Sequence, residues 1–121
     1  MAYWSDSGVR ATSFAGGSGT SSSPYLISTP AQLGYLCYLI NSSTSTSYKS
    51  KYYKLTADLN MNANYWIPIG YTSTSYAFTG NFDGDGHTIS YITINGTYSG
   101  CGLFGYAGSS ATIKNLKMTK L

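Results

Sequence analysis

Charged residues are scarce in this sequence, and glutamate is absent altogether. Charged residues make up 9% of the 121-residue chain, whereas they make up roughly 25% of an ordinary soluble domain. With seven basic residues and a net charge of +3, the chain lacks the dense basic patch of a nucleic-acid-binding protein. Its polar surface must come from neutral groups, mainly Ser, Thr, Asn, Gly and 13 Tyr. This composition is typical of extended β structure outside the cell, and the many aromatics exclude a disordered chain.

Cysteine and histidine are also rare. Cys37 and Cys101 are the two cysteines, no CxxC pair is present, and His87 is the single histidine. These counts exclude an ordinary zinc site. Both a disulfide and two free thiols are compatible with a secreted protein. Two free, buried thiols are the favoured interpretation, because Cys37 fits the apolar face of a helix and Cys101 precedes an apolar run.

Long hydrophobic runs are missing. No stretch approaches the ~20 apolar residues that span a bilayer, so no membrane insertion is predicted. The first residues also lack the basic and apolar regions of a signal peptide. An extracellular protein with this sequence would therefore be a mature form or a fragment. The strand-like stretch 112–121 stops without a turn or cap, and this open end predicts self-association as one alternative role.

The chain is predicted to form one domain, with a loop-rich lead-in over residues 1–24 and β-rich coils over residues 25–121. Residues 25–27 form a short apolar strand. One helix is predicted directly after it, because Thr29 is a good N-cap and Pro30 suits the first helical position. A single apolar stripe then follows at helical spacing, made by Leu33, Leu36, Cys37 and Ile40.

From Lys51 onward the sequence has β character, and one pattern repeats. Residues 89–94 and 113–118 share an apolar-x-x-apolar-x-apolar frame that recurs 24 positions apart, and a similar frame surrounds Leu59. The turns before these two frames also align, so Thr88 is expected opposite Thr112. Short strands at a period of 20–35 residues favour a solenoid over a β-sandwich with a chance repeat.

Three segments carry a resemblance to a known family: Trp66-Ile67-Pro68-Ile69-Gly70, the stretch from Phe78 to Ile89, and Gly102-Leu103-Phe104-Gly105. In order and spacing they closely resemble the GLUG-motif proteins, which are large surface and secreted proteins of bacteria. The resemblance covers nearly the whole chain. It implies an all-β fold, a right-handed parallel β-helix (solenoid) with one short N-terminal capping α-helix. It also implies adhesion as the usual role.

Enzymatic chemistry finds little support. Catalysis on sugars usually needs a pair of carboxylates at a set separation, and the chain has four aspartates in all. Asp83 and Asp85 share one turn, and turn chemistry explains both. Their alternative role is a weak Ca²⁺ site, although a full calcium loop needs more ligands and a glutamate. His87 has no identifiable triad partner and is expected to hydrogen-bond within the turn. We predict no catalytic residues and no cofactor.

The tyrosines are too numerous to be all in the core. Exposed aromatic rings stack on sugars and anchor protein partners, although rings that shield strand edges are the simpler alternative. The predicted ligand-binding residues are Tyr71, Tyr76, Tyr98 and Tyr106. The sequence therefore predicts a non-catalytic module of a bacterial cell-surface or secreted adhesin-like protein. It would bind host or bacterial glycans or proteins, or act as a spacer. The alternative is a fragment of a β-helical polysaccharide lyase or glycosidase.

Overall fold

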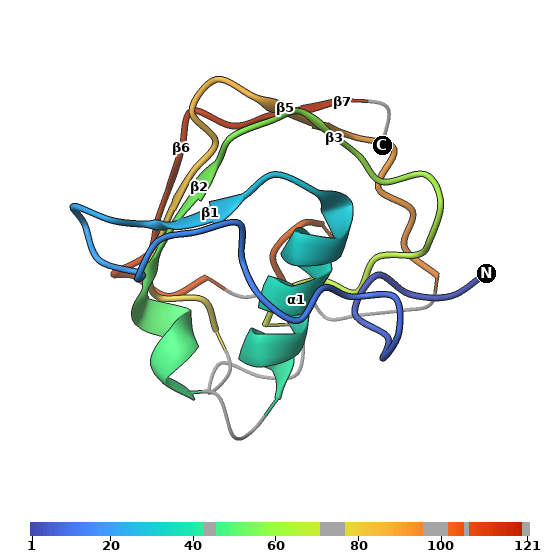
Figure 1. Cartoon of the computed structure of the whole chain (residues 1–121), viewed down its shortest axis with the longest axis horizontal. Helices are drawn as coiled ribbons and strands as arrows, with labels where there is room; N and C mark the ends of the chain where they lie inside the picture. The colour runs from blue at the N-terminus through green and yellow to red at the C-terminus, as the bar shows by residue number, and fades with distance from the viewer. Residues whose placement is uncertain (43–45, 71–76, 96–101, 106, 120–121) are drawn as a thin grey trace.

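A computed structural model describes residues 1–42, 46–70, 77–95, 102–105 and 107–119. These residues contain two sheets of parallel strands, one α-helix and a short 3-10 helix, joined by loops and turns (Figure 1). The four-stranded sheet has the order β1 (Tyr25–Ile27), β2 (Tyr52–Leu55), β4 (Asn81–Asp83) and β6 (Thr112–Lys114). The three-stranded sheet has the order β3 (Leu59–Asn60), β5 (Thr88–Ser90) and β7 (Lys117–Thr119). The helices are α1 (Pro30–Asn41) and η1 (Thr46–Ser50).

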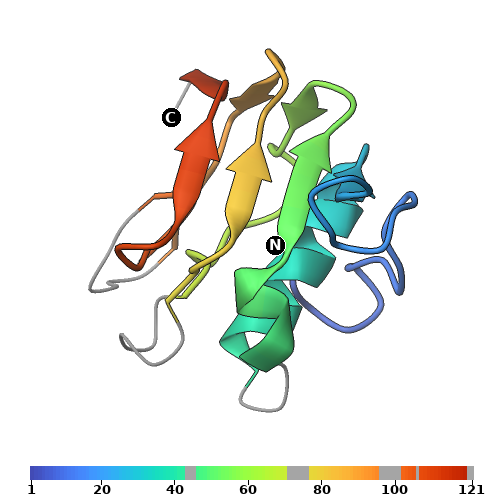
Figure 2. The same cartoon turned by 90° about the vertical axis from the view of Figure 1, so that its left-hand side faces the viewer.

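The chain alternates between the two sheets. It turns a corner from β2 into β3, from β4 into β5 and from β6 into β7, and it returns to the first sheet after β3 and after β5. Strands that are neighbours in space are therefore about 30 residues apart in sequence, as in the pairing of Leu59 with Ile89. Figure 2 shows β2, β4 and β6 side by side, with α1 at the β2 side of the sheet.

The predicted fold class, an all-β right-handed parallel β-helix, is wrong. The described residues form an α/β mix of short parallel strands in two sheets and a 12-residue helix. The strands are two to four residues long, because corners at residues 56–58, 84–87 and 115–116 interrupt the runs that the sequence presents as continuous β structure. The helix is also part of the core and not an addition to it, since its apolar side joins the same cluster of buried residues as both sheets.

The predicted register of the repeat is wrong as well. Ile113 pairs with Phe82, and Ile89 pairs with Met118, so residues 24 positions apart do not face each other. Thr88 likewise lies opposite Lys117 and not opposite Thr112. The two similar frames fall on different parts of the fold. Residues 89–94 leave the sheet after Ser90, whereas residues 113–118 cross from β6 through a corner into β7.

The helix prediction is confirmed. The Thr29 side chain accepts a hydrogen bond from the Gln32 N–H (3.2 Å), and the Gln32 side chain accepts one from the Thr29 N–H (3.2 Å). This reciprocal pair satisfies donors that every helix N-terminus leaves free. The predicted apolar stripe of α1 is buried in the core. The short strand at Tyr25–Ile27 is confirmed too.

The core lies between the two sheets and α1. Trp66 is its largest fully buried side chain, and its indole N–H donates to the carbonyl oxygen of Leu103 (3.1 Å). Cys37 is a free, buried thiol whose sulfur donates to the carbonyl oxygen of Ile67 (3.1 Å). Cys101 lies outside the described residues. No helix in the described part of the chain is both long and apolar enough to cross a membrane.

Candidate functional site

An aromatic pocket lies where the lead-in meets the first strand and both helices. It encloses about 250 Å³. The lead-in, β1, α1 and η1 each contribute to its wall, and the lining residues are Thr12, Ser13, Phe14, Gly16, Gly17, Tyr25, Tyr35 and Tyr48. The pocket thus joins four segments that are separate in the sequence.

The aromatic rings of the pocket pack against one another in a fixed arrangement. Phe14 stacks on Tyr25 with ring centroids 4.7 Å apart, and it contacts Tyr35 at 5.1 Å. Tyr25 lies 6.1 Å from Tyr48. Tyr53 is almost fully buried behind these rings, and its hydroxyl donates to the carbonyl oxygen of Tyr48 (2.6 Å). These half-buried rings are therefore held in place by one another, which lowers the entropy lost when a ligand binds.

Backbone pairing holds the lead-in beside β1. The Leu26 N–H donates to Gly16 (2.9 Å), and the Ala15 N–H donates to Leu26 (2.8 Å), which forms an antiparallel bridge. Gly17 has a φ of +88° and presses against the Pro24 carbonyl, where an added Cβ would lie 1.8 Å from the oxygen. A residue with a side chain does not fit at this position. The glycines that the sequence presents as a plain loop therefore bring Phe14 onto the ring of Tyr25.

The pocket is chemically neutral. Among the residues that the structure describes, none that lines the pocket carries a formal charge at neutral pH, and the polar groups there are hydroxyls and backbone amides. Burial raises the pKa of the Tyr25 hydroxyl, and the nearby Tyr48 and Tyr35 raise it further, so this phenol stays protonated at neutral pH. Flat aromatic faces beside neutral donors and acceptors suit an uncharged ligand that has both an apolar face and hydroxyl groups.

The predicted ligand-binding tyrosines, Tyr71, Tyr76, Tyr98 and Tyr106, all lie outside the described residues. The structure instead brings together Tyr25, Tyr35 and Tyr48 with Phe14, none of which the sequence pattern marks as a binding residue. One signal is present in the sequence. Tyr35 lies on the predicted helix but off its apolar stripe, so its ring has to project away from the buried face.

Asp83 is the last residue of β4, and Asp85 lies in the turn that follows, with the geometry expected of a turn. The Asp85 N–H donates to the Asp83 carboxylate (2.8 Å), and Gly86 has a φ of +79°. The same Asp83 oxygen accepts a hydrogen bond from the side chain of Asn115 (3.1 Å), while Asp85 lies 3.8 Å from the Lys54 ammonium. Burial raises the pKa of Asp83, but these hydrogen bonds and the nearby lysines outweigh it and lower the pKa.

The two aspartates have no further metal ligands beside them in the part of the chain that the structure describes, where no group of three His, Cys, Asp or Glu side chains occurs. Asp83 is already engaged by two hydrogen bonds through one oxygen. The arrangement of these carboxylates is therefore that of a turn.

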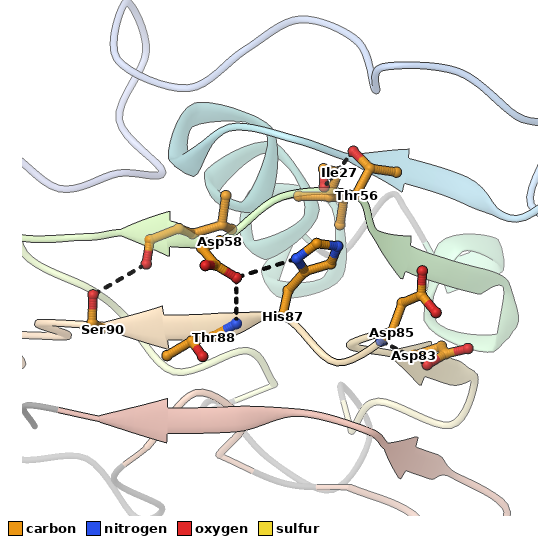
Figure 3. A network of polar contacts seen from close by, with 9 residues as sticks. Ile27, Thr56, Asp58, Asp83, Asp85, His87, Thr88 and Ser90 are labelled. Carbon is orange, nitrogen blue, oxygen red and sulfur yellow. Dashed lines mark hydrogen bonds and ion pairs between the residues drawn. The ribbon is translucent and has the colours of Figure 1, made fainter.

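The backbone N–H of His87 donates within its own turn, to the Gly84 carbonyl (2.9 Å), as predicted, but its side chain bonds outside the turn. Its Nδ1 atom lies 3.2 Å from the carboxylate of Asp58, which belongs to the preceding corner of the fold and not to the turn of His87 itself (Figure 3). The same carboxylate oxygen accepts the Thr88 N–H (2.9 Å). Asp58 thus bridges two successive corners. The sequence could not reveal this contact, because the two residues come together only through the pairing of β3 with β5.

No protein-family model matches the chain, and no solved structure matches it. Two relatives are similar over most of its length. The chain is 34% identical over 127 residues to Halomucin of Haloquadratum walsbyi, in a match that covers 96% of the chain and 1% of Halomucin. It is 33% identical over 113 residues to a protein of Evansella cellulosilytica whose name describes a Gly-rich membrane protein, covering 88% of the chain and 12% of that protein. The chain thus spans a small fraction of either relative.

Proposed function

We propose that this chain is a non-catalytic glycan-binding module of a larger cell-envelope protein. The observation that carries the proposal is the aromatic pocket, in which Phe14, Tyr25, Tyr35 and Tyr48 surround a hollow whose described lining residues are all uncharged. Sugars present apolar C–H faces that stack on aromatic rings and hydroxyls that bond to neutral polar groups. Tyrosine suits both contacts, because its ring can stack and its hydroxyl can form hydrogen bonds. Its rigid ring also loses little conformational entropy on binding.

Similarity to two envelope-type proteins associates the chain with the cell envelope. The narrower location, on the bacterial surface or in the secreted fraction, belongs to the proposal. So does membership of the GLUG-motif proteins, which rests on the segments between Trp66 and Gly105. An adhesin-like role agrees with the small share that the chain occupies in its relatives, since binding modules are often short segments of long surface proteins.

The position of the carboxylates supports a binding role over a catalytic one. No acidic side chain is among the described residues that line the aromatic pocket. Asp58 is committed to the Thr88 N–H and to His87, and Asp83 is committed to its own turn. No contact among the described residues favours the polysaccharide lyase or glycosidase of the sequence-based alternative.

A glycan array with the whole chain tests the proposal. We expect binding to neutral glycans that is lost in Tyr35→Ala, partly retained in Tyr35→Phe, and unchanged in Tyr38→Ala. Tyr38 is a matched control, because it lies on the same helix but stacks on Arg10 outside the pocket. Circular dichroism shows whether each variant is folded. If no glycan on the array binds the native chain, or if folded Tyr35→Ala binds as well as the native chain, the proposal is overturned.

A further inference from the structure

A second hollow lies on the outer face of the four-stranded sheet. It encloses about 260 Å³, close to the volume of the aromatic pocket. It is lined by the lead-in and by β2, β4 and β6, through Ser21, Pro24, Tyr52, Tyr53, Asn81, Asp83 and Lys114. The proposed function makes no use of this hollow, which we call the strand groove.

The strand groove and the aromatic pocket are adjacent. Pro24 lines the groove, and the next residue, Tyr25, lines the pocket. Tyr53 also lines the groove, and its ring lies 5.7 Å from that of Tyr25. The segment 17–25 runs between the two hollows, and the Tyr52 N–H holds it on β2 by donating to the Gly19 carbonyl (3.0 Å). A ligand that fills both hollows has to cross one short stretch of chain.

The polar groups of the groove come from facing positions on parallel strands. Tyr52 pairs with Asn81, and Asp83 pairs with Lys114. The groove therefore offers an exposed ring, an amide, a carboxylate and an ammonium group side by side. Sugar hydroxyls both donate and accept hydrogen bonds, so they match this mixture of groups. The single negative and single positive charge cancel, which favours a ligand with no net charge.

We propose that the aromatic pocket and the strand groove are two subsites for one linear, neutral oligosaccharide. This inference rests on the proposed function and names its ligand class. One sugar unit stacks in the aromatic pocket, the sugar chain passes over Pro24 and Tyr25, and a later unit bonds to Asn81 and Lys114. Each hollow is smaller than the roughly 300–1,000 Å³ of a pocket for a drug-sized ligand, so each fits a single sugar ring better than a whole chain.

Calorimetric titration with oligosaccharides of increasing length tests the inference. The probes are neutral β-1,4-linked and α-1,4-linked glucose oligomers, from the single sugar to chains of six units, plus the neutral glycans found on the array. We expect affinity to rise by at least about tenfold once the ligand is long enough to reach both subsites, because the second contact becomes intramolecular. Further lengthening should then change the affinity little.

Variants separate the two subsites. Lys114→Gln and Asn81→Ala should remove the gain with chain length and leave the affinity for the single sugar unchanged. Tyr35→Ala should weaken every ligand. Lys117→Gln is the matched control, because this exposed lysine lies on β7 in the other sheet.

The outcomes distinguish the two proposals. An affinity independent of chain length, or a gain that survives Lys114→Gln and Asn81→Ala, overturns the two-subsite inference and leaves the glycan-binding function standing. Preference for an acidic oligosaccharide over its neutral counterpart overturns the neutral ligand class. Failure of all sugars to bind overturns the proposed function itself.

Discussion

The carboxylate of Asp58 holds the imidazole of His87, with 3.2 Å between Oδ1 and Nδ1, although the two residues are 29 positions apart in the sequence. The same oxygen accepts the Thr88 N–H, so one side chain fastens the corner after β2 to the start of β5. Asp83 acts similarly at the next corner, where it accepts a hydrogen bond from Asn115. Aspartates of this chain therefore join consecutive corners, and their loss should affect stability before it affects binding.

Acid should weaken the fold, with Asp58 as a contributor. The Thr88 N–H, followed by the His87 side chain, lowers the pKa of Asp58. A carboxyl whose pKa is lowered in the folded state stabilises the protein at pH values above its unfolded-state pKa of about 4. This contribution disappears as the pH falls through the folded-state pKa. We expect Asp58→Asn to unfold at lower urea concentration than the native chain at about pH 6. Between about pH 6 and about pH 3, the variant should lose less stability than the native chain does.

His87→Gln separates the two contacts that lower the pKa of Asp58, the Thr88 N–H and the His87 side chain. Since the Thr88 N–H is the larger one, this variant should keep most of the pH dependence that Asp58→Asn loses. Urea unfolding followed by circular dichroism measures both variants. If the free energy of unfolding falls between the two pH values as much in Asp58→Asn as in the native chain, the Asp58 carboxylate is not responsible for the acid sensitivity.

Alkali should weaken the fold through Tyr53. Burial, with smaller effects from Tyr25, Tyr48 and Tyr35, raises the pKa of the Tyr53 hydroxyl far above its usual range. This group causes no loss of stability below the unfolded-state pKa of about 10. Above it the unfolded chain ionises while the folded chain stays neutral, so the free energy of unfolding falls as the pH rises.

Tyr53→Phe tests this effect. Removing the hydroxyl also removes its bond to the Tyr48 carbonyl, so we expect a loss of about 1 kcal/mol at neutral pH. Above about pH 10 the variant should lose less stability than the native chain does. Parallel curves of stability against pH for the two proteins would contradict the assignment.

Replacing Gly34 by alanine should destabilise the protein, although alanine is usually more stabilising than glycine within a helix. Alanine normally stabilises a helix by about 1 kcal/mol relative to glycine. Here a Cβ would lie 2.2 Å from the carbonyl oxygen of Trp4, which packs directly on α1. We expect Gly34→Ala to destabilise the protein by about 1–3 kcal/mol, as overpacked sites do. Urea unfolding gives the sign, and a more stable variant would show that the lead-in does not pack against the helix.

Cys37 should be unreactive in the folded protein. Burial raises the pKa of its thiol to about 12, more than the hydrogen bonds with Ser5 and Asn41 lower it. Thiolate is the reactive form. In a Cys101→Ser background, we expect Ellman's reagent to label Cys37 in urea and to leave it unmodified in native buffer. Rapid labelling without denaturant would indicate that α1 opens from the core.

Local chemistry made some elements of the fold predictable. The helix begins at Pro30 because Thr29 and Gln32 cap each other's backbone N–H groups within one turn. The turn at Asp83 forms because that carboxylate bonds to an N–H two residues on. Such contacts join residues close in sequence, so a pattern of residue types is enough to find them.

The register of the strands was not predictable in this way. It depends on where each corner falls, and the corner between β6 and β7 contains Asn115 at a φ of +56°. Bonds from Gly84 and Gly86 to the carbonyls of Lys114 and Asn115 align this corner with the one before it (2.9 Å each). These contacts exist only once the strands are stacked, and the apolar frame of residues 113–118 gives no sign of them.

By itself, the sequence determined a charge-poor, hydroxyl-rich chain with one capped helix, short apolar strands and glycine-bearing turns, because these properties follow from composition and from contacts within a few residues. Tertiary structure alone decided the candidate site. Phe14, Tyr25, Tyr35 and Tyr48 come from four separate segments. They form a pocket because Gly17 lets the lead-in press against Pro24 while α1 packs its apolar side into the core. Contacts over such distances depend on the packed shape of the whole domain.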